Sequence, residues 1–101
     1  MLNLKTLVLL TSLCVVGASA KSGKEVYRLC VGCHGQHGEK PAVGVSKPIK
    51  GQKAALTIKQ LKAYKAGTLD MHGMGKLMNK YAKRLNENEI KAVAAYIASM
   101  R

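Results

Sequence analysis

One short motif constrains this chain more than any other feature: residues 29–35 read L-C-V-G-C-H-G. Cys30 and Cys33 stand three residues apart, and His34 follows the second cysteine directly. Residues three apart on a helix lie on one face, so both thiols can reach the same neighbouring group. The histidine adds a metal-binding imidazole at the same turn of chain. The fold therefore has to give these three side chains a common partner.

The spacing C-x-x-C-H is the one at which c-type haem is attached. A zinc site would need four nitrogen or sulfur ligands, and residues 21–101 contain no second cysteine pair. A thioredoxin-like redox pair would need a βαβ context, but residues 21–101 have no strand-like alternation. We therefore predict that Cys30 and Cys33 bind one haem c covalently and that His34 binds its iron.

The first twenty residues are typical of a secretory signal peptide. One positive charge at Lys5 precedes an apolar run over residues 7–17, and the small residues Ala18-Ser19-Ala20 follow. We expect cleavage after about Ala20, a functional domain over residues 21–101, and loss of Cys14 with the leader. The apolar run is shorter than the roughly 20 residues of a membrane span, although an uncleaved anchor is the alternative.

Composition supports both export and a prosthetic group. The chain has no Trp and no Phe, and only four Tyr, so its own core is small. A domain of this size usually needs a staple or a bound group, and a large apolar macrocycle would supply one. Residues 21–101 carry 16 Lys and Arg against five Asp and Glu, a net charge of +11. Such a field attracts acidic partners; export and the lack of a recognition motif argue against nucleic acid.

Capping and periodicity predict three helices joined by two loops. The first begins at a Ser22 capping box and carries both cysteines near its end. A loop rich in glycine covers residues 35–51, a second helix covers 53–66, and Gly67 ends that helix. Residues 68–83 are irregular, with a short helical turn in 75–81. The last helix begins at Asn86, with Glu89 completing its box, and its predicted buried stripe is Ile90, Val93, Ala94 and Ile97.

The sixth iron position decides the function. An open position would allow gas binding or peroxide chemistry, whereas a second protein ligand suits electron transfer, and methionine opposite histidine raises the reduction potential. His37 lies too close to the motif to reach the opposite face of the haem. The other candidates follow the second helix, which is the right topology for closing over that face; they are Met71, His72, Met74 and Met78.

Several further stretches resemble those of small monohaem class I cytochromes c of the bacterial periplasmic type. Besides the cysteine motif, the resemblance is carried by K-P-I-K-G-Q, Q-L-K-A-Y-K-A-G and M-N-K-Y-A-K-R-L-N-E-N-E-I-K-A-V-A-A-Y-I, which begin at residues 47, 60 and 78. It implies an all-α fold of three to five helices around one covalently attached haem. Met78 matches the axial methionine by its position before the Leu85-Asn86 cap. Met74 is a weaker candidate, and His72, a departure from the family, is another.

The family also packs its first helix against its last, and Gly23, Tyr27 and Tyr96 are similar in type and place. A backbone carbonyl, from Pro48 or a neighbour, is expected to orient the haem histidine.

The resemblance implies a periplasmic carrier of single electrons that is not itself an enzyme. It would be a monomer that docks transiently on acidic redox partners, including membrane-bound respiratory complexes. The expected docking residues are Lys40, Lys47, Lys50, Lys53 and Lys76. A haem-based gas or redox sensor with a displaceable sixth ligand is the alternative, and a permanent small subunit of a larger enzyme is another.

Overall fold

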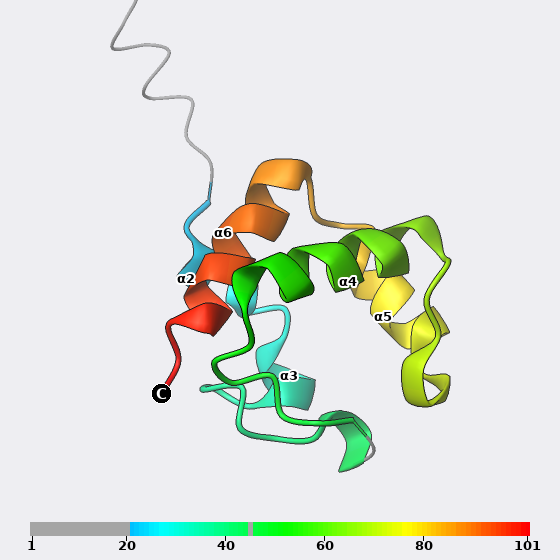
Figure 1. Ribbon diagram of the computed structural model, residues 1–101, viewed down its shortest axis with the longest axis horizontal. Coiled ribbons are helices and arrows are strands. Elements are labelled where there is room, and N and C mark those ends of the chain that lie inside the picture. Colours follow the sequence, from blue (N-terminus) through cyan, green and yellow to red (C-terminus); the bar gives the residue numbers. More distant parts are fainter. Residues whose placement is uncertain (1–20, 45) are drawn as a thin grey trace, which may run out of the picture.

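The computed structural model describes residues 21–44 and 46–101, and this part of the chain forms an all-helical fold (Figure 1). It contains five α-helices and two 3-10 turns, and no strand. The helices are α2 (Gly23–Tyr27), α3 (Val31–His34), α4 (Ala54–Ala66), α5 (Gly75–Ala82) and α6 (Glu87–Ala98), and the turns are η1 (Ala42–Gly44) and η2 (Met71–Gly73). The expected all-α class is confirmed. The predicted signal peptide, with Cys14, lies outside the described residues.

The two predicted capping boxes and the predicted glycine cap are confirmed. Ser22 Oγ accepts a hydrogen bond from the Glu25 backbone N–H at 3.2 Å, and Glu25 Oε1 accepts one from the Ser22 N–H at 3.1 Å. Asn86 and Glu89 form the same reciprocal pair at the start of α6. Gly67 follows α4 with φ 76° and ψ 21°, the left-handed conformation that glycine adopts without steric cost.

The prediction of one continuous first helix is wrong. α2 ends at Tyr27 and α3 begins at Val31, because the N–H groups of Leu29 and Cys30 bond to carbonyls three residues back. This tighter pattern interrupts the α-helical register. Cys30 thus becomes the N-cap of α3, and Cys33 lies inside that helix. The two cysteines still belong to a single turn of chain.

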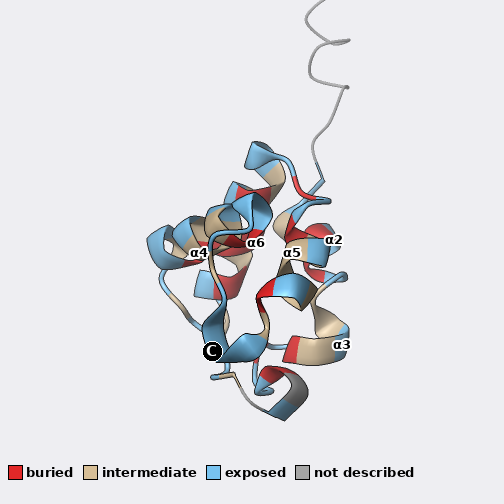
Figure 2. Cartoon of the chain, turned by 90° about the vertical axis from the view of Figure 1, so that its right-hand side faces the viewer, coloured by how far each residue is buried: buried red, intermediate tan, exposed pale blue. Residues whose placement is uncertain are grey.

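α2 and α6 pack closely because α2 starts with a glycine. A Cβ at Gly23 would lie 2.8 Å from the Tyr96 Cβ and would collide with the Ala92 carbonyl. The Tyr27 and Tyr96 rings meet with centroids 5.5 Å apart, which confirms the contact that the resemblance implied. Figure 2 colours buried parts of both helices red. The core cluster is Val26, Tyr27, Leu85, Ile90, Val93 and Ile97.

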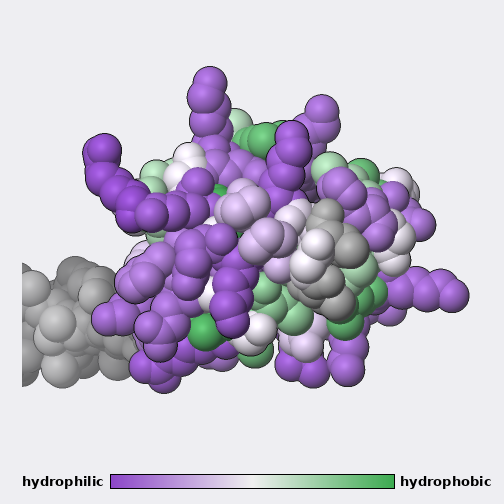
Figure 3. Space-filling view, turned by 90° about the horizontal axis from the view of Figure 1, so that it is seen from below, coloured by the Kyte–Doolittle hydropathy of each residue, from purple (hydrophilic) through white to green (hydrophobic). Residues whose placement is uncertain are grey.

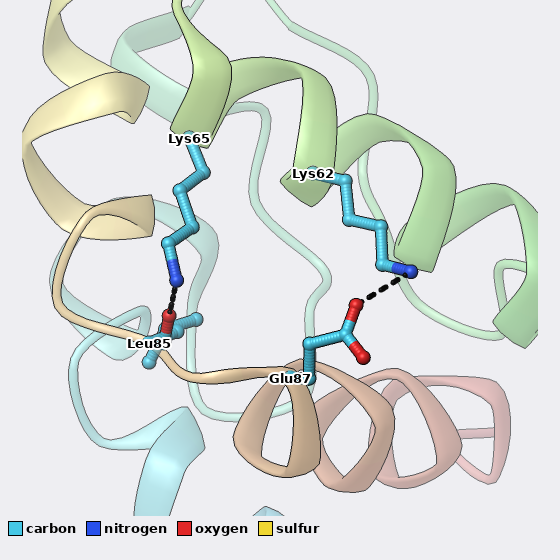
Figure 4. Close-up of polar contacts among 4 residues, drawn as sticks. All are labelled: Lys62, Lys65, Leu85 and Glu87. Atoms are coloured by element: carbon cyan, nitrogen blue, oxygen red, sulfur yellow. Dashed lines mark hydrogen bonds and ion pairs between the residues drawn. The ribbon is translucent and has the colours of Figure 1, made fainter.

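Two segments of the chain are more regular than expected. α5 is a helix of eight residues rather than a short turn, and η1 lies in a loop where no helical turn was predicted. α4 lies beside α5 and also packs on α6 (Figure 1). Lys65 of α4 is exposed, and its Nζ donates to the Leu85 carbonyl (Figure 4). None of the described helices has the length and apolar character needed to span a membrane.

Candidate haem site

The helices enclose a cavity of about 500 Å³, which lies in the size range of cofactor pockets. Apolar side chains from several segments form most of its wall. They come from the α2–α3 turn, the loop before α4, the α5–α6 connection, and helices α4, α5 and α6, and include Leu29, Ile49, Leu61, Leu77, Leu85, Val93 and Ile97. Leu29, Leu56 and Met71 line the cavity and are also exposed, so they mark its mouth.

The motif side chains lie together on this wall. Cys30, Cys33 and His34 all line the cavity, and both cysteines are half-buried free thiols. Burial, with a smaller effect of the Cys33 thiol, raises the pKa of Cys30 to about 11, so this sulfur is held as the neutral thiol near neutral pH.

His34 is buried, and one of its ring nitrogens lacks a hydrogen-bond partner in the part of the chain that the structure describes. Its side chain is 8% exposed, and burial lowers the pKa of its imidazole, which favours the neutral ring that binds metals. Its Nδ1 is buried and makes no hydrogen bond to the described residues. The expected carbonyl from Pro48 or a neighbour is therefore not in place here. A buried imidazole without a polar partner, beside two thiols and an apolar cavity, fits a haem ligand.

Four of the five candidates for the sixth ligand also line the cavity: Met71, His72, Met74 and Met78. Met78 lies in the middle of α5 and is half-buried. His72 is exposed and has φ 58° and ψ 24°, the one positive φ among described residues other than glycine. His37 is exposed and is not part of the cavity wall. The structure thus excludes His37 from the wall and brings the other four together without choosing between them.

Sequence reasoning missed a polar strip in this otherwise apolar wall. Gln52 Nε2 donates to Thr57 Oγ1 at 2.8 Å and to Gln60 Oε1 at 2.9 Å. Gln60 Nε2 then contacts the Met71 sulfur at 3.8 Å. Thr57 is only 5% exposed. The spacing of Thr57 and Gln60 along one face of a helix was the available signal, since polar side chains at i and i+3 on a buried face need a polar partner.

The five lysines expected to dock partners are all exposed: Lys40, Lys47, Lys50, Lys53 and Lys76. Lys47 is the member of this set that lines the cavity. Figure 3 shows one face of the molecule, on which long hydrophilic side chains project and apolar atoms lie in small patches between them.

One apolar cavity is lined by two thiols, a buried imidazole and several thioethers. Such a cavity defines a small all-α protein built to hold a haem. Comparison with known proteins agrees, because residues 20–101 match the family model for cytochrome c. The chain is 37% identical over 103 residues to cytochrome c-553 of Nitratidesulfovibrio vulgaris, covering 96% of this chain and 100% of that protein. It is 33% identical to cytochrome c-553 of Helicobacter pylori over 77% of each chain.

A third relative is cytochrome c4 of Stutzerimonas stutzeri, which is 29% identical over 82% of this chain, and the match spans 44% of that longer protein. The chain belongs to the cytochrome c family. It is a small class I cytochrome c of electron transport, and its cofactor is covalently bound haem c. Cys30 and Cys33 are the cysteines among the described residues.

Proposed function

We propose that this cytochrome is an exported, monomeric carrier that shuttles single electrons in the periplasm. It takes them from a dehydrogenase or a quinol-oxidising complex and delivers them to a terminal oxidase, peroxidase or reductase. The observation that carries the proposal is that Cys30, Cys33, His34 and Met78 all line one apolar cavity. Haem bound there supplies an iron centre that gains or loses one electron.

Each residue of the site has a separate task in this proposal. Cys30 and Cys33 would hold the macrocycle through two thioethers, and His34 and Met78, which line the same cavity, would bind its iron. With both ligands bound, the iron would have no position for a substrate. The apolar wall excludes water, which favours a methionine-ligated centre of raised potential.

The polar strip of Gln52, Thr57 and Gln60 suits the two carboxylates of haem. Thr57 Oγ1 accepts a hydrogen bond from Gln52, which leaves its hydroxyl hydrogen free to donate. Hydrogen bonds to a carboxylate are among the stronger ones in proteins. In this proposal, these three side chains would hold the carboxylates of bound haem by hydrogen bonds.

Transient docking follows from the charge and from the mouth of the cavity. Leu29, Leu56 and Met71 give the mouth an apolar surface, and Lys47, which is exposed and lines the same cavity, adds a positive charge there. Small contacts of this kind, strengthened by long-range attraction, suit partners that must separate quickly. An acidic patch on a redox enzyme, including a membrane-bound one, is the expected partner.

The test of the ligand set is optical. In ferric holoprotein, a weak far-red charge-transfer band reports methionine bound to iron. Met78→Ala is expected to abolish this band, while Met71→Ala, Met74→Ala and His72→Ala are expected to keep it. Loss of the band in Met74→Ala alone would contradict the assignment. Tight carbon monoxide binding by unmodified ferrous protein would instead favour the gas-sensor alternative.

A further inference from the structure

Asn79 follows Met78 on α5 but takes no part in the cavity wall. Its side chain points instead to the neighbouring helix: Nδ2 donates to the Tyr64 carbonyl at 2.6 Å and to the Lys65 carbonyl at 3.3 Å. These carbonyls belong to the last turn of α4, which lies beside α5 (Figure 1). Asn79 therefore joins the two helices through one side chain.

The end of α4 needs such a donor, because the last carbonyls of a helix lack partners within it. The Gly67 N–H donates to the Tyr64 carbonyl at 3.0 Å, and the Thr68 N–H donates to the Ala63 carbonyl at 2.9 Å. This Schellman arrangement leaves the Lys65 carbonyl without a donor. Both partners of Asn79 are acceptors, and its amide nitrogen, with two hydrogens, can donate to both at once.

A second contact fixes the beginning of α5. Asp70 Oδ1 accepts a hydrogen bond from the Gly75 backbone N–H at 2.7 Å. Met78 lies between the two fixed points, and its own N–H donates to the Met74 carbonyl at 2.9 Å. The position of the Met78 sulfur is thus determined by how α5 is attached to α4 and to Asp70.

We propose that Asn79 is a positioning residue for the sixth ligand. By attaching α5 to the end of α4, it holds the Met78 thioether at the place where it can bind haem iron, and so resists displacement of that sulfur by other ligands. This inference rests on the proposed ligation by Met78. Asn79 itself does not bind iron in this proposal; it acts only by fixing the position of α5.

Imidazole competition with ferric holoprotein tests the proposal. Asn79→Asp keeps the shape of the side chain but removes both donors and sets a carboxylate against two carbonyls. Asn88→Asp makes the same chemical change at an exposed position of α6. We expect Asn79→Asp to bind imidazole at least about tenfold more tightly than unmodified protein, equivalent to about 1.4 kcal/mol, with a weakened far-red band. Asn88→Asp is expected to match unmodified protein.

A purely structural role would give a different result. Asn79→Asp would then be easier to unfold in guanidinium, yet its imidazole affinity would equal that of Asn88→Asp, and the proposal would be overturned. If Asn79→Asp does not fold, Asn79→Ala replaces it, and imidazole affinity unchanged from unmodified protein has the same meaning. Met78→Ala separates the two hypotheses. If that variant keeps the far-red band, the ligand assignment fails; if it loses the band while Asn79 variants bind imidazole normally, only the positioning role fails.

Discussion

Tyr27 connects the haem motif to the helical core. Its side chain is 2% exposed, its ring packs on Tyr96, and its hydroxyl donates to the Gly35 carbonyl at 2.6 Å. Gly35 follows His34 directly, so this hydrogen bond fixes the chain just after the predicted iron ligand. Burial raises the pKa of Tyr27 to about 12, because the charged phenolate is poorly solvated inside the protein.

Tyr27→Phe is expected to lower the free energy of unfolding by about 1–3 kcal/mol, because it leaves the Gly35 carbonyl unpaired in a buried place. The pKa gives the pH dependence. The folded state favours the neutral phenol, so its contribution is fully present below the ordinary pKa of 10 and is lost as the pH rises toward about 12.

Guanidinium unfolding of holoprotein from neutral pH to about pH 12 measures both effects. Unmodified protein should lose stability over the alkaline part of this range more steeply than Tyr27→Phe. Tyr96→Phe, which keeps the ring pair and removes a half-buried hydroxyl, serves as the control. Equal losses in the two variants would contradict the importance of the Gly35 contact.

At the residue scale, the sequence predicted those site residues that belong to a short motif or to a stretch that resembles a known family. Cys30, Cys33 and Met78 do line a common cavity. The polar strip around Gln52 was not predictable in the same way, because its hydrogen bonds join a loop residue to one face of a helix. The spacing of Thr57 and Gln60 indicates that they share a helix face, but the packing of the loop on that helix decides which loop side chain meets them.

At the element scale, caps were predictable and interruptions were not. Capping boxes and the glycine after α4 are local signals, since the residues that satisfy one another lie within three or four positions. No glycine or proline lies between α2 and α3, so the sequence does not indicate the break. It depends on tertiary contacts: Tyr27 is held by α6 on one side, while His34 lies on the cavity wall on the other.

Two lysines of α4 reach the beginning of α6, and they should differ in importance (Figure 4). Lys65 Nζ donates to the carbonyl of buried Leu85, whereas Lys62 forms a 2.9 Å ion pair with exposed Glu87. Lys65→Met is expected to lower the free energy of unfolding by about 1 kcal/mol or more, because it removes a charge-assisted hydrogen bond. Lys62→Met should have a smaller effect, since exposed ion pairs are screened by water and salt.

Thermal or guanidinium unfolding of the two holoprotein variants, at low and at high salt, measures this difference. The loss in Lys65→Met should persist at high salt, while any loss in Lys62→Met should shrink. A larger loss for Lys62→Met would mean that the ion pair, and not the carbonyl contact, joins the two helices.

At the scale of the whole molecule, the cavity bears on both the stability of the fold and the proposed docking of partners. The core cluster lies where α2 packs on α6, and three of its members, Leu85, Val93 and Ile97, also line the cavity. Haem therefore supplies the missing part of the core as well as the redox centre, in keeping with the small size of the domain. Residues 21–101 carry a net charge of +11, and Lys47 brings part of it to the cavity wall.

If the positive charge near the cavity guides docking, its placement should matter more than its amount. Lys47→Glu and Lys91→Glu make the same change in net charge, but only Lys47 lines the cavity. Stopped-flow rates of electron transfer to an acidic redox partner should fall several-fold in Lys47→Glu and much less in Lys91→Glu at low ionic strength. The difference should fade as salt rises to about 0.1 M and beyond, where charges are screened over about 10 Å. Equal rates for the two variants, or rates of unmodified protein that ignore salt, would mean that docking depends on the apolar mouth of the cavity rather than on the lysines around it.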